Sequence, residues 1–381
     1  MDDALPQLRP PERLLCGPGP TNVDPAVLEA MTRPMLGHLD PAMHEILLDV
    51  VELLRRVYRM PDGLVLPLHC TGTAGMEAGI VNLLEPGDTV IVAQCGFFGR
   101  RIAEIARRHG ARVVTVTAGW GECVSNDALI GALAEEPRAR MLAVVHAETS
   151  TGVEHPLAEL GAALRDRDTL LMADCVTSLA GVPLEVGAWG VDFAYSCTQK
   201  CLAAPPGMSP LAVSERAVER ICSRRTPVPF TFDLLALEQY WVARPVTYHH
   251  TAPILSIYAL HEALRGVLVE GLEERWARHA EAAEHLQAEV ESRGLELLAD
   301  ADHRLAPLTA VRVPEGVDGK AVQGRMLREH GIEIGGGLGP DAPAMWRIGL
   351  MGRNASIETA DRVLAALDAA LVEEAAPALA G

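Results

Sequence analysis

The strongest constraint on the fold is an alternation of short apolar runs with helical stretches between residues 64 and 214. Apolar residues recur at helical spacing at 74–84, 98–109, 126–136 and 156–166. Seven runs rich in apolar and β-branched residues accompany them: Leu64–Leu68, Thr89–Ala93, Arg112–Thr117, Met141–His146, Thr169–Ala173, Phe193–Ser196 and Leu211–Ser214. Apolar strands separated by helices of about ten residues are typical of parallel sheets covered on both faces. The sequence therefore predicts an α/β fold with a mostly parallel, seven-stranded sheet.

The flanking regions have a different pattern. Residues 1–20 are rich in proline and glycine and predict an irregular arm, and residues 44–58 predict a helix. Beyond the sheet, the pattern predicts a long helix at 255–290 broken between Gly266 and Gly271, β-like runs at 295–298 and 308–313, and a final helix at 356–373. We therefore expect an N-terminal arm (1–21), a large domain (22–270) and a smaller C-terminal α+β domain (271–381).

Composition narrows the classes of partner. The formal net charge of −18 argues against nucleic acid, and a small anionic substrate would need locally placed Arg or Lys. The eight cysteines form no CxxC pair, so we expect reduced thiols and no metal site. No apolar run approaches ~18 residues, which argues against a membrane span. The acidic start, Met-Asp-Asp, lacks the basic start of a signal peptide, and the expected location is the cytoplasm.

A lysine and an aspartate each follow a β-like run. Lys200 comes shortly after Tyr195-Ser196, and Asp174 ends the segment that begins at Leu170. Ligand sites in such sheets lie at the carboxyl ends of the strands. Pyridoxal phosphate requires an amine to condense with its aldehyde and a carboxylate to keep its ring nitrogen protonated. A single lysine of this kind is usually a solvated surface charge, so the hypothesis depends on the residues around it.

Two further segments suit such a cofactor, although each has a plainer interpretation. Residues 70–78 (CTGTAGMEA) join a β-like run to a helix and could cradle a phosphate, or form a ligand-free turn. Phe98, within Gly96-Phe97-Phe98-Gly99, could stack on a flat ring, but core packing is favoured from the sequence alone.

The C-terminal half offers three more candidates. His249 and His250 are adjacent and lack a carboxylate at helical spacing, which argues against a metal site. The hydroxyls of Tyr248 and Thr251 beside them suit a phosphate or a carboxylate. Arg347 stands between Trp346 and Ile348, so we expect it to be partly buried and to need an anion. That anion is either a structural Asp or Glu or a substrate carboxylate held by two hydrogen bonds.

Taken together, these segments resemble the class V, fold type I aminotransferases, which depend on pyridoxal phosphate, and within them the alanine–glyoxylate/serine–pyruvate branch. The resemblance follows the order of the family's motifs along almost the whole chain. The matching segments are residues 17–22 (GPGPTN), 81–88 (VNLLEPGD), 148–153 (ETSTGV), 173–178 (ADCVTS), 199–200 (QK), 204–207 (APPG), 248–251 (YHHT), 336–340 (GGLGP) and 346–352 (WRIGLMG).

The resemblance implies a role for each site residue. Lys200 would attach the cofactor and carry a proton to and from the substrate. Asp174 would pair with the ring nitrogen, and Arg347 would bind the substrate carboxylate with Gly19 beside it. The remaining cofactor contacts would be Gly72, Thr73 and Gln199 at the phosphate, Thr149 near the phenolic oxygen, Val176 and Phe98 at the ring, and Tyr248 and Thr251 at the phosphate of the neighbouring subunit. The last two imply a homodimer with shared active sites.

The implied activity is transfer of an amino group from alanine or serine to glyoxylate or pyruvate. Phe98 and Thr73 stand where a relative has Trp and His, and these departures bear on substrate preference more than on cofactor identity. Other donors, namely 2-aminoethylphosphonate, ureidoglycine and pyridoxamine, remain alternatives. A class V lyase ranks lower, because Cys197 and Cys201 flank Lys200 too closely to act from a flexible loop. A catalytically silent binding protein is disfavoured by the presence of both Lys200 and Asp174.

Overall fold

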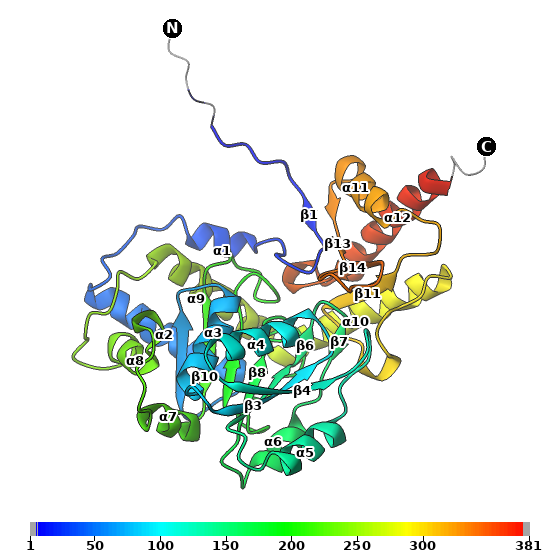
Figure 1. The fold of residues 1–381 in the computed structure, drawn as a ribbon. Helices are drawn as coiled ribbons and strands as arrows, with labels where there is room; N and C mark the ends of the chain where they lie inside the picture. The colour runs from blue at the N-terminus through cyan, green and yellow to red at the C-terminus, as the bar shows by residue number, and fades with distance from the viewer. Residues whose placement is uncertain (1–4, 6, 376–381) are drawn as a thin grey trace.

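A seven-stranded sheet forms the centre of the larger part of the molecule, in a computed structural model that describes residue 5 and residues 7–375 (Figure 1). The strand order is β2–β10–β9–β8–β5–β3–β4. Only β10 runs antiparallel to its neighbours in this sheet, so the predicted mostly parallel sheet is confirmed. The strands are β2 (Leu64–Leu68), β3 (Thr89–Gln94), β4 (Arg112–Thr117), β5 (Met141–Val145), β8 (Leu170–Asp174), β9 (Phe193–Tyr195) and β10 (Ser209–Val213).

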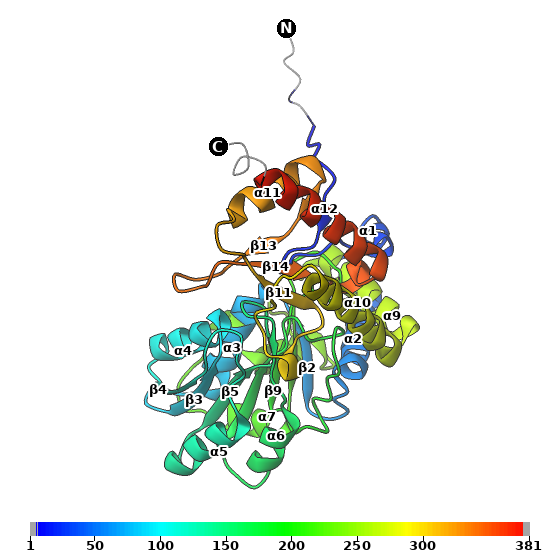
Figure 2. The ribbon, with the colours of Figure 1, turned by 90° about the vertical axis from the view of Figure 1, so that its right-hand side faces the viewer.

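Helices cover both faces of this sheet. Helices α3 and α4 pack on one face, and α5 and α6 pack on the other (Figure 2). Side-chain oxygens of Thr71 and Ser125 cap α3 and α5, as expected for these residue types before a helix. The helices around the sheet are α2 (Pro41–Tyr58), α3 (Gly72–Leu83), α4 (Phe97–Arg108), α5 (Asn126–Glu135), α6 (Ala158–Leu164), α7 (Glu215–Cys222) and α8 (Leu234–Trp241).

The C-terminal part has its own sheet and core. Helices α9 (Ile254–Glu270) and α10 (Leu272–Ser292) meet at Gly271, whose φ of 95° breaks the long helix where the sequence predicted. Trp346, Leu286 and Val363 belong to a second buried apolar cluster. This cluster lies between a three-stranded sheet and three helices: β11 (Leu308–Arg312), β13 (Gly335–Gly336), β14 (Met345–Gly349), α10, α11 (Gly319–Glu329) and α12 (Ile357–Ala375).

Two details of the predicted C-terminal part need comment. The predicted strand at 295–298 is wrong, because Leu297 forms an isolated bridge to Val311 and no longer ladder. The division into 1–21, 22–270 and 271–381 stays a proposal, although its second boundary coincides with the break between α9 and α10. Within residues 7–375, no helix is long and apolar enough to cross a membrane.

The N-terminal arm is more ordered than the sequence predicted. Leu14–Leu15 form β1, which pairs in parallel with β12 (Ile332–Glu333) and ties the arm to the C-terminal part. A two-residue strand has no periodicity to detect, and its partner lies more than 300 residues away. The arm then passes into α1 (Pro25–Ala30) through the segment Gly17–Pro20. The shorter elements are β6 (Ala147–Glu148), β7 (Val153–Glu154) and the 3-10 turns Phe230–Phe232, Ala301–His303 and Gly352–Asn354.

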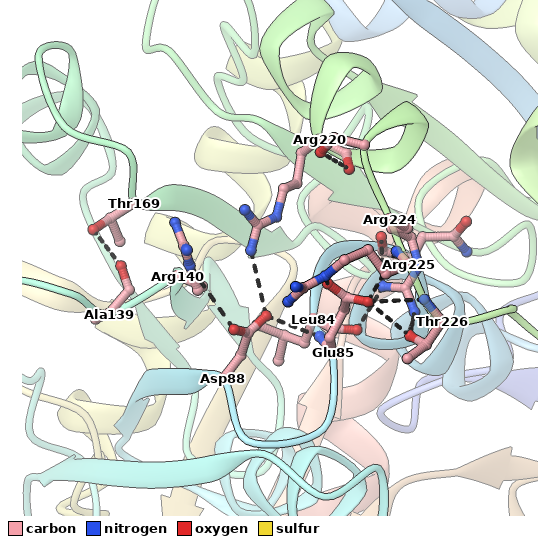
Figure 3. A network of polar contacts seen from close by, with 12 residues as sticks. Leu84, Glu85, Asp88, Ala139, Arg140, Thr169, Arg220, Arg224, Arg225 and Thr226 are labelled. Atoms are coloured by element: carbon pink, nitrogen blue, oxygen red, sulfur yellow. Dashed lines mark hydrogen bonds and ion pairs between the residues drawn. The ribbon is translucent and has the colours of Figure 1, made fainter.

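The segment Glu85–Asp88 lies at the amino ends of the parallel strands, opposite their carboxyl ends, in a network of polar contacts (Figure 3). Asp88 Oδ2 accepts a hydrogen bond from the Glu85 amide at 2.9 Å and lies 3.3 Å from Arg220 Nη2. Glu85 Oε1 accepts from the Thr226 amide at 2.9 Å and from the Arg225 amide at 3.0 Å. The matching segment at residues 81–88 therefore stabilises the fold at this end of the sheet and does not contribute to the cavity at the other end.

Packing of α6 against the loop after residue 188 requires glycine at 161. A β-carbon at Gly161 would collide with the backbone carbonyl of Trp189, which has no side-chain freedom to move aside. We predict that Gly161→Ala lowers the free energy of unfolding by about 1–3 kcal/mol, the usual cost of overpacking. Gly131→Ala, at an exposed site in α5 with nothing within 4 Å, is the control and should stabilise by up to about 1 kcal/mol. Urea unfolding of both variants measures this, and equal stabilities would contradict it.

Candidate active site

A cavity of about 170 Å³ opens at the carboxyl ends of the strands. It brings together eight of the residues predicted to bind a cofactor: Gly72, Thr73, Phe98, Thr149, Asp174, Val176, Gln199 and Lys200. Its wall is completed by residues not predicted to be there, namely Thr71, Met76, Ala147, Thr177 and Cys197. The segments that meet here lie more than a hundred residues apart in sequence, and the parallel strand order is what gathers them.

Lys200 lies in the loop after β9 and is 9% exposed. Its amine donates a hydrogen bond to the carbonyl oxygen of Pro18, in the N-terminal arm. Burial lowers the pKa of the Lys200 amine, which increases the neutral, nucleophilic fraction at neutral pH. Gly19 has a φ of 103°, and a β-carbon there would collide with the Lys200 side chain. The close approach of the arm to this amine therefore depends on glycine.

Asp174 ends β8 and is buried. The parallel register of β8 and β9 places it opposite Tyr195, whose hydroxyl donates to Asp174 Oδ2 at 2.5 Å. The Val176 amide donates to Oδ1 at 2.9 Å. Burial raises the pKa of the Asp174 carboxyl to about 6, while these two hydrogen bonds oppose that shift. The carboxyl is thus largely ionised at neutral pH and can pair with a buried cation in the cavity.

The amino end of α3 forms another wall of the cavity. Thr71 Oγ1 accepts from the Ala74 amide at 3.2 Å, and Thr71, Gly72 and Thr73 line the cavity. The first amides of a helix have no partner within the helix. A β-carbon at Gly72 would lie 3.2 Å from the side chains of Val176 and Cys197, so a larger residue at position 72 would crowd this wall of the cavity. Gln199 Oε1 and Thr177 Oγ1 are buried here without a hydrogen-bond partner among the described residues. Such a helix start with unused polar atoms suits an anion such as phosphate.

The amino end of α4 carries Phe98 to the cavity. Glu148, which is fully buried, accepts hydrogen bonds from the Phe98 amide at 3.0 Å and the Gly99 amide at 3.3 Å. Burial raises the pKa of the Glu148 carboxyl, and its hydrogen bonds oppose that rise. Phe97 and Phe98 pack edge to face at 5.6 Å, with only Phe98 lining the cavity. Phe98 also packs on the main core. Its position therefore agrees with core packing and with a place at the cavity, the two interpretations that the sequence allowed.

Arg347 lies on β14 next to the cavity and is 6% exposed. Nε donates to Gly336 O at 2.6 Å, and Nη1 donates to the carbonyl of Thr149 at 3.1 Å. In the described part of the chain, no Asp or Glu lies within ion-pair distance of this guanidinium. Burial lowers the pKa of Arg347 to about 10, with Glu148 opposing the shift, so it remains charged at neutral pH. The alternative of a structural carboxylate partner is therefore not realised.

Tyr248 and Thr251 do not join this cavity. Tyr248 is 56% exposed and packs beside His38 and Tyr240, at ring-centroid distances of 5.5 Å and 6.4 Å. Thr251 lines a separate hollow with residues 35–38 and 252–256. No group of three or more His, Cys, Asp or Glu among residues 7–375 could hold a metal ion.

Tyr195, Glu148 and Pro18 act on predicted site residues but were not themselves predicted. Tyr195 touches Asp174 through strand register, and Pro18 reaches Lys200 through a turn of the arm. Neither relation leaves a periodic signal in the sequence. Glu148 had a signal, because a carboxylate directly before Thr149 in a buried segment needs hydrogen-bond donors.

Comparison with known proteins identifies relatives along nearly the whole chain. Residues 14–358 match the class-V aminotransferase family. The crystal structure of an alanine–glyoxylate aminotransferase from Nostoc sp. is 48% identical, with a TM-score of 0.93 over 96% of this chain and 97% of that one. The ureidoglycine–glyoxylate aminotransferase from Bacillus subtilis is 38% identical, with a TM-score of 0.94 over 97% and 95%.

A third relative is known from its sequence. The alanine–glyoxylate aminotransferase of Rattus norvegicus is 40% identical over 365 residues, which cover 95% of this chain and 88% of the relative. The seven-stranded α/β architecture described above is thus the fold type I arrangement of these solved aminotransferases. The chain belongs to the class-V aminotransferases, a family that depends on pyridoxal phosphate.

Proposed function

We propose that this aminotransferase moves an amino group from alanine or serine to glyoxylate or pyruvate. The observation that carries the proposal is Arg347, a buried and unpaired cation beside the cavity that holds Lys200 and Asp174. A guanidinium without a protein anion suits the α-carboxylate that every amino acid and 2-oxo acid carries. All three relatives named above take glyoxylate according to their names, which supports glyoxylate as the acceptor.

The residues around the cavity fit pyridoxal phosphate. The start of α3 and the side chains of Gln199 and Thr177 line the cavity, and a phosphate would accept hydrogen bonds from the α3 amides, the Gln199 NH₂ group and the Thr177 hydroxyl. Asp174 offers a carboxylate for the ring nitrogen, and Phe98 and Val176 offer apolar surface for the ring. When bound, the cofactor supplies an electron sink that allows the α C–H bond of the substrate to ionise.

The chain's own residues supply positioning and proton transfer. Lys200, with its lowered pKa, offers a neutral amine that would hold the cofactor through its aldehyde, with loss of water. Once displaced by the substrate's own amine, the free Lys200 amine would accept the α-proton and return it. Arg347 fixes the carboxylate, and with it the α-carbon, through a planar pair of donors. Thr149 lines the cavity and is tied to Arg347 through its carbonyl. Glu148 holds the start of α4 and so fixes Phe98.

A ureidoglycine donor is a second candidate. The Bacillus subtilis relative is named for that donor and has a TM-score of 0.94 to this chain. A product assay separates the two: the purified protein is given alanine, serine, ureidoglycine, 2-aminoethylphosphonate or pyridoxamine with glyoxylate or pyruvate. We expect alanine and serine with glyoxylate to react fastest. Lys200→Ala is the negative control, and turnover by that variant would contradict the assignment of Lys200.

Asp174→Asn tests the partner of the ring nitrogen. Asparagine keeps the shape but not the negative charge, so the protonated ring loses its counter-ion. We predict that kcat falls by more than tenfold, which is about 1.4 kcal/mol of barrier, while the yellow colour of bound cofactor persists. Stopped-flow measurement of α-deuterated alanine shows whether proton removal has become slower. Turnover within about threefold of the unmodified enzyme would mean that Asp174 has another role.

Arg347→Lys tests recognition of the carboxylate. Lysine keeps the charge but loses the planar fork, so one of two hydrogen bonds is lost. We predict that KM for both alanine and glyoxylate rises about tenfold or more, on the order of 1.4 kcal/mol. The absorbance of bound cofactor should stay the same, because Arg347 does not line the cofactor cavity. Steady-state kinetics decide the matter, and unchanged KM values would assign the carboxylate to another residue.

We propose further that the active unit is a homodimer. Leu28, Met35 and Tyr248 are 50%, 71% and 56% exposed, near a hollow of about 680 Å³ and another of about 420 Å³ that open beside α1 and α9. A second copy would cover this apolar surface. Tyr248 and Thr251 of each copy would then lie at the cavity of the other copy. Light scattering should give twice the chain mass, and Met35→Asp should weaken the dimer. Val372→Asp, on exposed α12, is the control, and a fully active monomer would refute the proposal.

A further inference from the structure

Two adjacent arginines on α4 make different contacts. Arg100 pairs with Asp341, at 3.0 Å between Nη1 and Oδ2. The guanidinium of Arg101 instead lies over the rings of Phe97 and Phe98, 4.7 Å and 5.3 Å from their centroids. Its Nη1 donates to Thr73 Oγ1 at 3.1 Å. Across residues 7–375, no carboxylate lies within ion-pair distance of Arg101.

The lack of a carboxylate partner is informative in a chain this acidic. Acidic side chains outnumber basic ones by 51 to 33, and neighbouring arginines such as Arg100 and Arg108 each have one as a partner. A guanidinium has five N–H donors, and Arg101 uses one of them on a neutral hydroxyl. Most of its hydrogen-bonding capacity is therefore available to an anion that is not part of the protein.

Arg101 contacts two side chains of the cavity wall, Thr73 and Phe98, and their position shows where such an anion would lie. Thr73 and Phe98 line the cavity, and Thr73 is in the first turn of α3. Because Thr73 Oγ1 accepts a hydrogen bond from Arg101, its own proton is free to be donated elsewhere. Arg347, which also lacks a carboxylate partner, is bonded to Thr149 and Gly336 and lies beside the cavity rather than in its lining. The two cations therefore serve two different anions.

We propose that Arg101 recognises the phosphate group of the cofactor, both by its charge and by orienting the hydroxyl of Thr73. The proposal deepens the proposed function and rests on it. The start of α3 supplies partial charges and neutral donors, and the guanidinium of Arg101 adds a full positive charge. Its contacts with Phe97 and Phe98 hold the guanidinium at the rim, so it loses little freedom when the phosphate binds.

The test compares two aldehydes that differ only in the phosphate. Affinities of cofactor-free protein for pyridoxal phosphate and for pyridoxal are measured by absorbance titration, for the unmodified chain, Arg101→Gln and Arg100→Gln. We expect Arg101→Gln to weaken pyridoxal phosphate about tenfold or more, or about 1.4 kcal/mol, and to change pyridoxal by less than twofold. Arg100 lies on the same helix, and Arg100→Gln removes its ion pair with Asp341. This control variant should change neither affinity. Raised salt should narrow the difference between the unmodified chain and Arg101→Gln.

Other results would overturn the proposal in distinguishable ways. Equal weakening of both aldehydes would mean that Arg101 acts by supporting Phe98. Unchanged affinity for both, with a higher KM for donors that carry a second acidic group, would make Arg101 a substrate residue. Arg101→Lys controls for a folding defect, because lysine keeps the positive charge but lacks the planar guanidinium. We expect this variant to recover part of the preference for the phosphorylated aldehyde. A variant that recovers none of it would count against recognition by charge. If the unmodified chain binds neither aldehyde, the proposed function itself fails.

Discussion

The site depends above all on the parallel register of β8 and β9, which buries Asp174 opposite Tyr195. An ionised carboxyl is costly to bury unless it receives hydrogen bonds, and Asp174 has two: from the Tyr195 hydroxyl and the Val176 amide. They oppose the desolvation that raises its pKa to about 6. A shift of one residue in this register would turn Tyr195 to the other face of the sheet and leave the carboxyl with one donor.

The two ends of the sheet treat charge in opposite ways. At the amino ends, Asp88 lies near Arg140 and Arg220, and Glu85 accepts from the amides after α7, so both carboxylates have partners (Figure 3). At the carboxyl ends, Lys200 and Arg347 are buried and donate to backbone carbonyls rather than to carboxylates. Buried cations without a carboxylate partner weaken a fold, so the presence of these two beside one cavity argues that they are kept for ligands.

Local patterns in the sequence predicted most of the framework and part of the site. Apolar runs gave the positions of β2 and β4, and Gly271 marked the break between α9 and α10. Relations between distant segments were not accessible: β1 has two residues, and Tyr195 meets Asp174 only through register. For Arg347 the sequence left two anions open, and the absence of a carboxylate among the described residues around it could be seen only in three dimensions.

Residues 16–20 of the arm link the loop that carries Lys200 to the strand that carries Arg347. Lys200 comes from the large sheet and Arg347 from β14, and the arm touches both: Pro18 O accepts from Lys200, while Cys16 O accepts from the Gly349 amide at 2.7 Å. Pairing of β1 with β12 fixes the arm to the C-terminal part. A misplacement of about 1 Å between reacting groups can cost about a hundredfold in rate. The arm, which the sequence marks only as rich in proline and glycine, contacts both the Lys200 amine and the strand that carries Arg347, and so constrains the spacing between these two cations.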